Sequence, residues 1–197
     1  LKHNNPYSEQ VPVVKTLGME PRKAKIGYYA GCTATYREKK ISESTISILK
    51  KLGADFTIVD GVCCGSVLQR IGADEQVPDL VKKNVEAIKS LGIETLIISC
   101  AGCYRMFKHE YPKFMELPFE VLHIAEYLAK QDLKLKPLGN VKVTYHDPCH
   151  LGRHCKVYEP PREVLKKFPG IEFKEMKFNK SASHCCCGGG GVRAAYP

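Results

Sequence analysis

Short apolar runs alternate with amphipathic stretches of helical length from residue 24 onward, and this alternation restricts the possible folds more than any other feature of the sequence. The runs predicted as strands are 25–30, 55–59, 94–99, 119–122, 141–145 and 171–176. The stretches predicted as helices are 42–52, 79–91, 104–111, 123–131 and 161–168. Strands that alternate with helices at this spacing are joined by right-handed crossovers, so they lie parallel. The sequence therefore predicts an α/β fold in which helices flank a parallel sheet.

The helix predicted over 42–52 has a clear beginning, end and inward face. Ser42 is a favourable capping residue, and Gly53 is of the type at which helices often end. Helical periodicity places five side chains on one face: Ile41, Thr45, Ile48, Leu49 and Leu52. We expect this face to pack against the sheet.

Residues 1–22 do not follow the alternating pattern. They contain three prolines and several polar residues, so they are predicted to be a linker or an arm that lies on another part of the protein. The sequence begins at Leu1 without a signal-peptide pattern, as the middle of a longer chain would.

The composition excludes several classes of protein. Hydrophobic residues make up 44% and charged residues 26% of the 197, which excludes a disordered or collagen-like chain. No apolar run approaches the ~18 residues of a membrane span. The net charge is +9, but no aromatic–basic pattern accompanies it, so nucleic-acid binding is disfavoured.

Ten cysteines carry the chemical information in the sequence. In open α/β sheets, functional sites form beyond the carboxyl ends of the strands. The cysteines at or just past a predicted strand end are Cys32, Cys63, Cys64, Cys100 and Cys149. These thiols are therefore predicted to meet at one edge of the fold, although they lie far apart in sequence.

The spacing of the first set favours a metal site over disulfides. Adjacent cysteines such as Cys63 and Cys64 rarely bond to each other, and two neighbouring thiolates repel unless a metal neutralises them. Cys100-x-x-Cys103 at a strand–helix junction presents two sulfurs toward one point. Soft thiolates select zinc or iron–sulfur clusters. A single zinc ion takes four ligands, so five cysteines favour a multinuclear cluster, with structural zinc and redox-active thiols as the alternatives.

The cysteine pattern recurs in the second part of the chain. Cys149 is followed by a predicted helix and strand and then by Cys185, Cys186 and Cys187, as Cys32 is followed by Cys63 and Cys64. The repeat predicts two similar α/β units, 23–136 and 137–197. A second Cys-x-x-Cys is expected roughly 35 residues beyond Cys186, so the second unit is predicted to continue past Pro197.

These motifs resemble the CCG domain, the cysteine-rich domain of heterodisulfide reductase catalytic subunits. The first copy matches at Cys32, at Cys63-Cys64-Gly65 and at Cys100-Ala101-Gly102-Cys103, and the stretch 145–153 resembles the start of the second copy. The resemblance implies pseudo-duplicated, Rossmann-like halves. The segment around 4–7 is similar to the linker that follows a ferredoxin-like domain in longer family members.

In this family the resemblance implies noncubane 4Fe–4S clusters, one or two per chain, each held by five cysteines. The first cluster would use Cys32, Cys63, Cys64, Cys100 and Cys103. The second would use Cys149, Cys185 and Cys186 with two later cysteines. The alternative pair is Cys186 and Cys187, because this chain has three consecutive cysteines where the family usually has two.

The implied activity is that of a heterodisulfide reductase-like oxidoreductase, in which a disulfide is cleaved between two clusters that each deliver one electron. His146 and His150 flank Cys149 and are the candidate catalytic proton donors. The alternative is an electron-transfer subunit of a glycolate, lactate or glycerol-3-phosphate-type dehydrogenase or of a sulfite-reduction-associated complex. A zinc-stabilised scaffold is a third possibility.

The expected partners follow from the same resemblance. They are electron-donating subunits of the ferredoxin-like, flavoprotein or cytochrome kind, together with a small disulfide substrate, and neither nucleic acid nor a membrane span of the chain's own is expected. The expected location is the cytoplasm, including the cytoplasmic face of a membrane through a partner.

Overall fold

The centre of the molecule is a four-stranded parallel sheet. In the computed structural model, which describes residues 1, 3 and 5–191, its strands are β1 (Ile26–Tyr29), β2 (Phe56–Ile58), β3 (Thr95–Ile98) and β4 (Glu120–His123). Their order is β2-β1-β3-β4, and all pairs are parallel. The predicted α/β fold with a parallel sheet is therefore confirmed.

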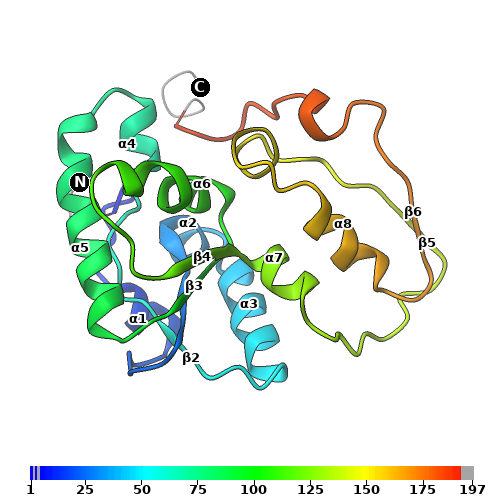
Figure 1. Ribbon diagram of the computed structural model, residues 1–197, viewed down its shortest axis with the longest axis horizontal. Helices are drawn as coiled ribbons and strands as arrows, with labels where there is room; N and C mark the ends of the chain where they lie inside the picture. The colour runs from blue at the N-terminus through cyan, green and yellow to red at the C-terminus, as the bar shows by residue number, and fades with distance from the viewer. Residues whose placement is uncertain (2, 4, 192–197) are drawn as a thin grey trace.

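Helices cover both faces of this sheet, and Figure 1 shows α3 and α5 on opposite sides of the strands. On one side, α5 (Val77–Ser90) and α6 (Ala101–Arg105) pack against Tyr29, Leu96 and Ile98. The other side carries α3 (Lys39–Lys51) against Tyr28, Ile58 and Ile97. Consecutive strand residues thus point into different cores, as the pleat of a strand requires.

Short elements complete this first lobe. They are α2 (Gly31–Tyr36), α4 (Ser66–Arg70), η2 (Asp74–Gln76), the π-helical turn η3 (Met106–Glu110), η4 (Tyr111–Lys113) and α7 (Ile124–Ala129). The helix predicted over 104–111 is therefore divided between α6 and η3, and η4 continues the chain through Pro112.

The arm contains a helix that the sequence did not predict, α1 (Val13–Leu17). Val13 and Val14 are buried in the same core as Tyr28 and Leu49. This part of residues 1–22 therefore lies on the sheet side that α3 covers.

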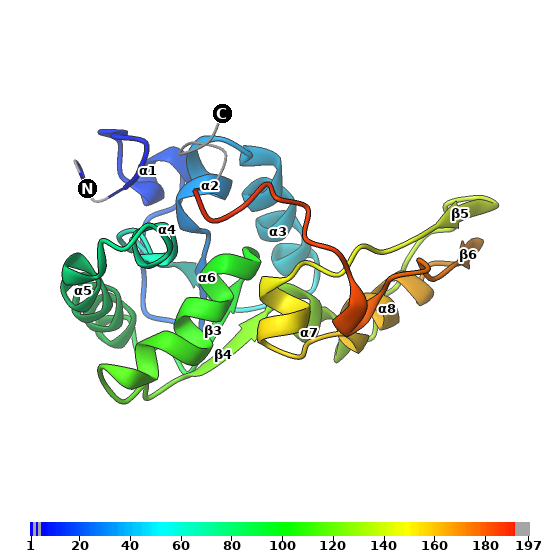
Figure 2. The same ribbon diagram turned by 90° about the horizontal axis from the view of Figure 1, so that it is seen from above.

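The second lobe is smaller. Strands β5 (Val141–Val143) and β6 (Ile171–Phe173) form a two-stranded parallel sheet, with η5 (His150–His154) and α8 (Glu159–Lys166) between them and η6 (Lys180–Ala182) after them. Val141 pairs with Ile171, and Ile26 pairs with Phe56, 30 residues along the chain in both cases. Figure 2 shows β5 and β6 extending away from the first lobe. The described residues thus repeat the β1–β2 crossover of the first lobe.

The inward face predicted for α3 is wrong in part. Ile41 and Ile48 are exposed, whereas Ser42, Thr45, Ile46 and Leu49 are buried. The helix begins at Lys39, so Ser42 lies inside it rather than at its cap. Its hydroxyl donates to the carbonyl oxygens of Ala34 and Lys39, at 2.7 and 2.8 Å, and these bonds allow a polar side chain to be buried.

Across the described part of the chain, every helix falls short of the length and apolarity that crossing a bilayer demands.

Candidate metal centre

The first cysteine set lies at the carboxyl edge of the four-stranded sheet, where Cys32 is in α2 and Cys103 in α6. Cys32 follows β1, Cys63 and Cys64 follow β2, and Cys100 follows β3. The chain passes from β1 outward to β2 and then returns to the other side of β1 for β3, so the loops after β1 and β3 flank a topological switch point. Ligand sites of open α/β sheets form at such points.

The five thiols of the first set lie in one continuous line of contacts. The thiol of Cys63 shares hydrogen bonds with those of Cys32 and Cys64. The thiol of Cys103 does the same with those of Cys64 and Cys100. Cys63, Cys64 and Cys103 are buried, while Cys32 and Cys100 are half-buried. The structure therefore brings together all five residues that the sequence singled out.

The pKa values of the thiols differ along this line. Hydrogen bonds from the thiols of Cys32 and Cys64, with another from the Gly65 N–H, lower the pKa of Cys63 to about 3. A hydrogen bond from Cys103, followed by backbone N–H groups, lowers the pKa of Cys100 to about 6. The pKa of Cys103 is raised by its bonds to Cys100 and Cys64 and by burial. Cys63 and Cys100 therefore have lowered thiol pKa values, whereas that of Cys103 is raised.

These residues fit a thiolate-ligated cluster better than a single ion. Every described cysteine is free, so none of these thiols is used in a disulfide. Among the described residues, no three Cys, His, Asp or Glu side chains surround a common metal-ion position. Five sulfurs spread along a line, with no carboxylate among them, match the ligand preference of an iron–sulfur cluster, whose several irons bind sulfurs at different points.

Two residues outside the cysteine motifs hold the Cys63-Cys64 main chain. The Asn84 amide, on α5, donates to the Cys63 carbonyl at 3.2 Å and to the Tyr111 hydroxyl at 2.9 Å. The Tyr111 hydroxyl in turn donates to the Cys64 carbonyl at 3.2 Å. Both side chains are fully buried. Sequence reasoning missed them; an asparagine on the apolar face of a predicted helix is the signal that could have found Asn84.

A cavity of about 280 Å³ opens beside this set. Cys32 and Cys63 line it together with Tyr36 and Asp60, and the arm supplies another wall that includes Glu9. The arm is tied to α2 at this place, because Arg37 pairs with Glu9 at 2.7 Å and the Tyr36 hydroxyl donates to the Val11 carbonyl at 2.9 Å. The arm therefore forms part of the surroundings of Cys32.

The second cysteine set is partly assembled. The thiols of Cys149 and Cys185 share a hydrogen bond. Cys187 makes its contacts with Cys185, because its N–H donates to the Cys185 sulfur at 3.4 Å. The three consecutive cysteines 185–187 are exposed, whereas Cys149 is half-buried. The nearness of Cys185 to Cys149 favours Cys185 and Cys186 as the ligand pair, and the choice between this pair and Cys186 with Cys187 stays a prediction. Cys155 is a free, half-buried cysteine outside both sets.

The two predicted histidines have different surroundings. The His146 ring forms a hydrogen bond with the His184 carbonyl at 2.9 Å, which occupies Nε2. His150 directly follows Cys149 of the second set. It also packs against Gly102 of the first set, where a methyl group on Gly102 would lie 3.3 Å from the His150 Nδ1. Burial, and then the charge of Arg70, lower the pKa of His150 to about 4. The His150 ring is therefore neutral at neutral pH, and the catalytic roles of both residues remain predictions.

Comparison with known proteins gives a family and several relatives. A family model described as a cysteine-rich domain, CCG, matches residues 26–108 and 143–197. One subunit of the dihydromethanophenazine:CoB–CoM heterodisulfide reductase from Methanosarcina acetivorans is 46% identical over 186 residues, which are 89% of this chain and 46% of that protein. One subunit of the fumarate reductase (CoM/CoB) from Methanothermobacter marburgensis is 39% identical over 93% of this chain and 37% of that protein.

Two further comparisons concern another oxidoreductase and a solved structure. The EtfAB:quinone oxidoreductase of Syntrophomonas wolfei is 40% identical over 83% of this chain and 24% of that protein. Among solved structures, an aspartate racemase of Picrophilus torridus aligns with 78% of this chain and 63% of that chain at a TM-score of 0.38 and 14% identity, a likeness that carries no inference.

The chain spans less than half the length of these curated relatives. Both matched stretches contain the cysteines that the structure gathers at the sheet edge or in the second lobe. The chain belongs to the CCG family of cysteine-rich domains.

Proposed function

We propose that this chain is the cluster-binding part of an iron–sulfur oxidoreductase subunit. The observation that carries the proposal is the unbroken line of contacts among five free thiols at the carboxyl edge of the sheet. Cys32, Cys63, Cys64, Cys100 and Cys103 would hold one cluster. Relatives named as heterodisulfide reductase and fumarate reductase subunits support a redox role.

The finer proposal is a noncubane 4Fe–4S cluster and reductive cleavage of a disulfide. Five cysteines exceed the four ligands of an ordinary cubane cluster, which supports the noncubane type. Such a cluster, when bound, supplies single electrons and an iron that can accept a thiolate. A second cluster would be held by Cys149, Cys185 and Cys186, with Cys186 and Cys187 as the alternative pair.

The chain's own residues would prepare the space between the two sets. His150 packs against Gly102, which lies between Cys100 and Cys103, and its neutral imidazole would offer an N–H hydrogen bond to a departing thiolate. Arg70 and Arg105 lie near enough to His150 to disfavour its charged form. These cations also favour a thiolate over a thiol in the same space, which assists cleavage of a sulfur–sulfur bond.

A second candidate function is electron transfer without disulfide chemistry. The 40% identity to an EtfAB:quinone oxidoreductase favours it. In that case the partner would be a flavoprotein or another electron carrier. For either function we propose redox subunits as partners and the cytoplasm, or the cytoplasmic membrane face through a partner, as the location.

Anaerobic reconstitution with iron and sulfide tests the cluster. We expect the native chain to bind iron and to absorb visible light. In Cys63→Ser, the iron and the absorption that belong to the first cluster should be lost. Cys155→Ser is the matched control, because Cys155 belongs to neither set. A colourless protein that binds zinc instead would overturn the proposal.

Turnover assays separate the two functions. Reduction of a small disulfide by the native assembly with a chemical electron donor supports the reductase. Electron transfer to a quinone or flavoprotein with no disulfide turnover supports the carrier function instead.

A further inference from the structure

Asp147, two residues before Cys149, forms a buried ion pair with Arg162. The side chains of Asp147 and Arg162 are each 1% exposed. They form two parallel hydrogen bonds, from Nη1 to Oδ1 and from Nη2 to Oδ2, each 2.7 Å long. Arg162 also donates to Glu175, whose side chain is 39% exposed. The pair is therefore bidentate, which is the geometry that fixes a carboxylate in one orientation.

Asp147 also holds the segment that leads into the consecutive cysteines. The Lys180 N–H donates to Asp147 Oδ2 at 2.6 Å. The Ser183 hydroxyl donates to the Asp147 carbonyl at 3.0 Å. On either side, His146 bonds the His184 carbonyl and the Arg153 guanidinium bonds the Ser183 carbonyl. The segment 180–184 is thus attached to the 146–153 stretch over most of its length.

These bonds join the two parts of the second cysteine set. Asp147 precedes Cys149 by two residues, and Ser183 precedes Cys185 by two residues. Figures 1 and 2 both show η6 (orange-red) near η5 (yellow). The attachments at Asp147 therefore bring Cys149 and Cys185 close to each other across a gap of more than thirty residues.

The first set is secured in another way. There, the neutral side chains of Asn84 and Tyr111, both buried in the core, hold the Cys63-Cys64 main chain. The cysteines 185–187 are exposed and have no such core around them. A fully hydrogen-bonded charge pair supplies positional specificity where packing is sparse.

We propose that Asp147 and Arg162 act together as positioning residues that hold Cys185 against Cys149. The inference rests on the proposed function only in taking these thiols as ligands of the second cluster. Arg162 fixes the Asp147 carboxylate, and Asp147 fixes the 180–184 segment. Removing either member releases the segment and separates the two thiols, while the first set keeps its geometry.

Oxidative crosslinking of the iron-free chain measures this directly. Diamide oxidises two adjacent thiols to a disulfide and takes up their two electrons and two protons. In the native chain we expect rapid formation of the Cys149–Cys185 disulfide, because the two thiols lie near each other. Its rate should fall roughly tenfold or more in Asp147→Asn and in Arg162→Gln, since the effective concentration of one thiol at the other falls. The double variant should be no slower than the worse single variant.

Internal controls keep the test specific. The Cys64–Cys103 crosslink should form at its native rate in every variant. Glu175→Gln changes the exposed partner of Arg162, and in this variant the Cys149–Cys185 crosslink should form at nearly the native rate. Ser183→Ala, a mild change, should slow the second crosslink roughly threefold. Ser181→Ala, whose side chain is exposed two residues away, should leave it unchanged.

The outcomes are decisive in both directions. Unchanged Cys149–Cys185 crosslinking in Asp147→Asn, Arg162→Gln and Ser183→Ala overturns the proposal. An equal fall of both crosslinks also overturns it, because the pair would then support the whole fold. If these changes prevent folding, Arg162→Lys, which keeps the charge but cannot form both parallel bonds to Asp147, still decides: it should slow the Cys149–Cys185 crosslink alone. Failure of the native chain to bind iron would count against the proposed function and leave this result standing.

Discussion

At the scale of single residues, the first cysteine set depends on side chains that are not cysteines. Asn84 satisfies the Cys63 carbonyl and the Tyr111 hydroxyl inside the core. Both acceptors are removed from water, so losing their donor carries the full cost of an unsatisfied buried group. The loop that bears Cys63 and Cys64 is therefore sensitive to a residue on a helix behind it.

Replacing Asn84 tests this dependence. Asn84→Ala should lower the free energy of unfolding by about 1–3 kcal/mol, measured by urea denaturation of the reduced, iron-free chain. Ser90→Ala, on the same helix, is the control, because the Ser90 hydroxyl is exposed. This change should alter the free energy of unfolding by less than about 0.5 kcal/mol. Equal stability of Asn84→Ala and the native chain would contradict the role assigned to these hydrogen bonds.

A buried histidine makes stability depend on pH. Burial lowers the pKa of His123 to about 4, from an ordinary value of 6.5. The unfolded chain therefore takes up this proton at a higher pH than the folded chain, so the contribution is present above pH 6.5 and is lost as the pH falls toward 4. At pH 5 the loss amounts to about 2 kcal/mol at most, from 1.36 kcal/mol per pH unit.

The variant His123→Asn isolates this contribution. Asparagine keeps an acceptor for the Ala125 N–H at the start of α7 but does not titrate. Between pH 7 and pH 5 the native chain should lose about 1–2 kcal/mol more stability than the variant, measured by urea unfolding at each pH. Parallel pH profiles for the two chains would rule out His123 as the source.

The sequence predicts where a residue lies in the fold when that residue follows the end of a strand in a parallel sheet. The first five cysteines could be predicted to meet, because parallel strands end at one edge and each loop is short. Asn84 and Tyr111 could not be predicted as their support, since their partners are main-chain atoms of a loop whose path depends on the assembled core.

At the scale of elements, helix α3 shows what periodicity leaves undecided. Its sequence offers one stripe through Ile41 and Ile48 and another through Ser42 and Ile46, and the structure buries the second. The choice depends on the carbonyl groups of α2 and α3 that accept from Ser42, which are tertiary contacts beyond the reach of a local pattern.

The β5–β6 pair should be the least protected part of the parallel sheets. Its strands pair only with each other among the described residues, and Val141 is 41% exposed. A two-stranded sheet with little burial opens without unfolding the rest of the molecule. The amides of β5 and β6 should exchange with deuterium roughly a hundredfold faster than those of β1 and β3, measured by hydrogen exchange and NMR or mass spectrometry. Equal protection of the two sheets would contradict this.

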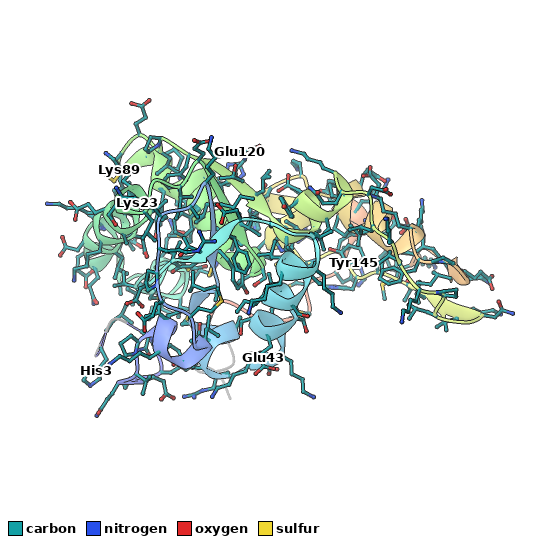
Figure 3. All side chains as sticks on the ribbon, turned by 90° about the horizontal axis from the view of Figure 1, so that it is seen from below. His3, Lys23, Glu43, Lys89, Glu120 and Tyr145 are labelled. Atoms are coloured by element: carbon teal, nitrogen blue, oxygen red, sulfur yellow. The ribbon has the colours of Figure 1, made fainter. Side chains whose placement is uncertain are left out.

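At the scale of the whole molecule, the arm and the second lobe attach to the first lobe at different places. Figure 3 shows His3 of the arm at one end of the molecule and Tyr145 of the second lobe toward the other. The arm is held by α1, through Val13 and Val14, and by its contacts with α2 near Cys32. It is therefore an integral part of the first lobe.

Shortening the two buried valines tests how far the fold depends on the arm. The double variant Val13→Ala/Val14→Ala should lose about 3 kcal/mol of stability, since each change removes roughly two buried methyl groups. Val11→Ala is the matched control, because Val11 is 52% exposed, and it should be nearly neutral. Urea unfolding measures all three chains, and a double variant as stable as the control would show that the arm is dispensable.

The open strands of the second lobe bear on how the purified chain behaves in solution. Unpaired strand edges recruit further strands, so β5 and β6 are places where copies of the molecule can add to one another and aggregate. Their side chains counter this with charge: Lys142 and Lys174 both lie within ion-pair distance of Glu172. Salt screens such exposed charges, so concentrated stocks should stay clear in dilute buffer and turn turbid as ionic strength rises.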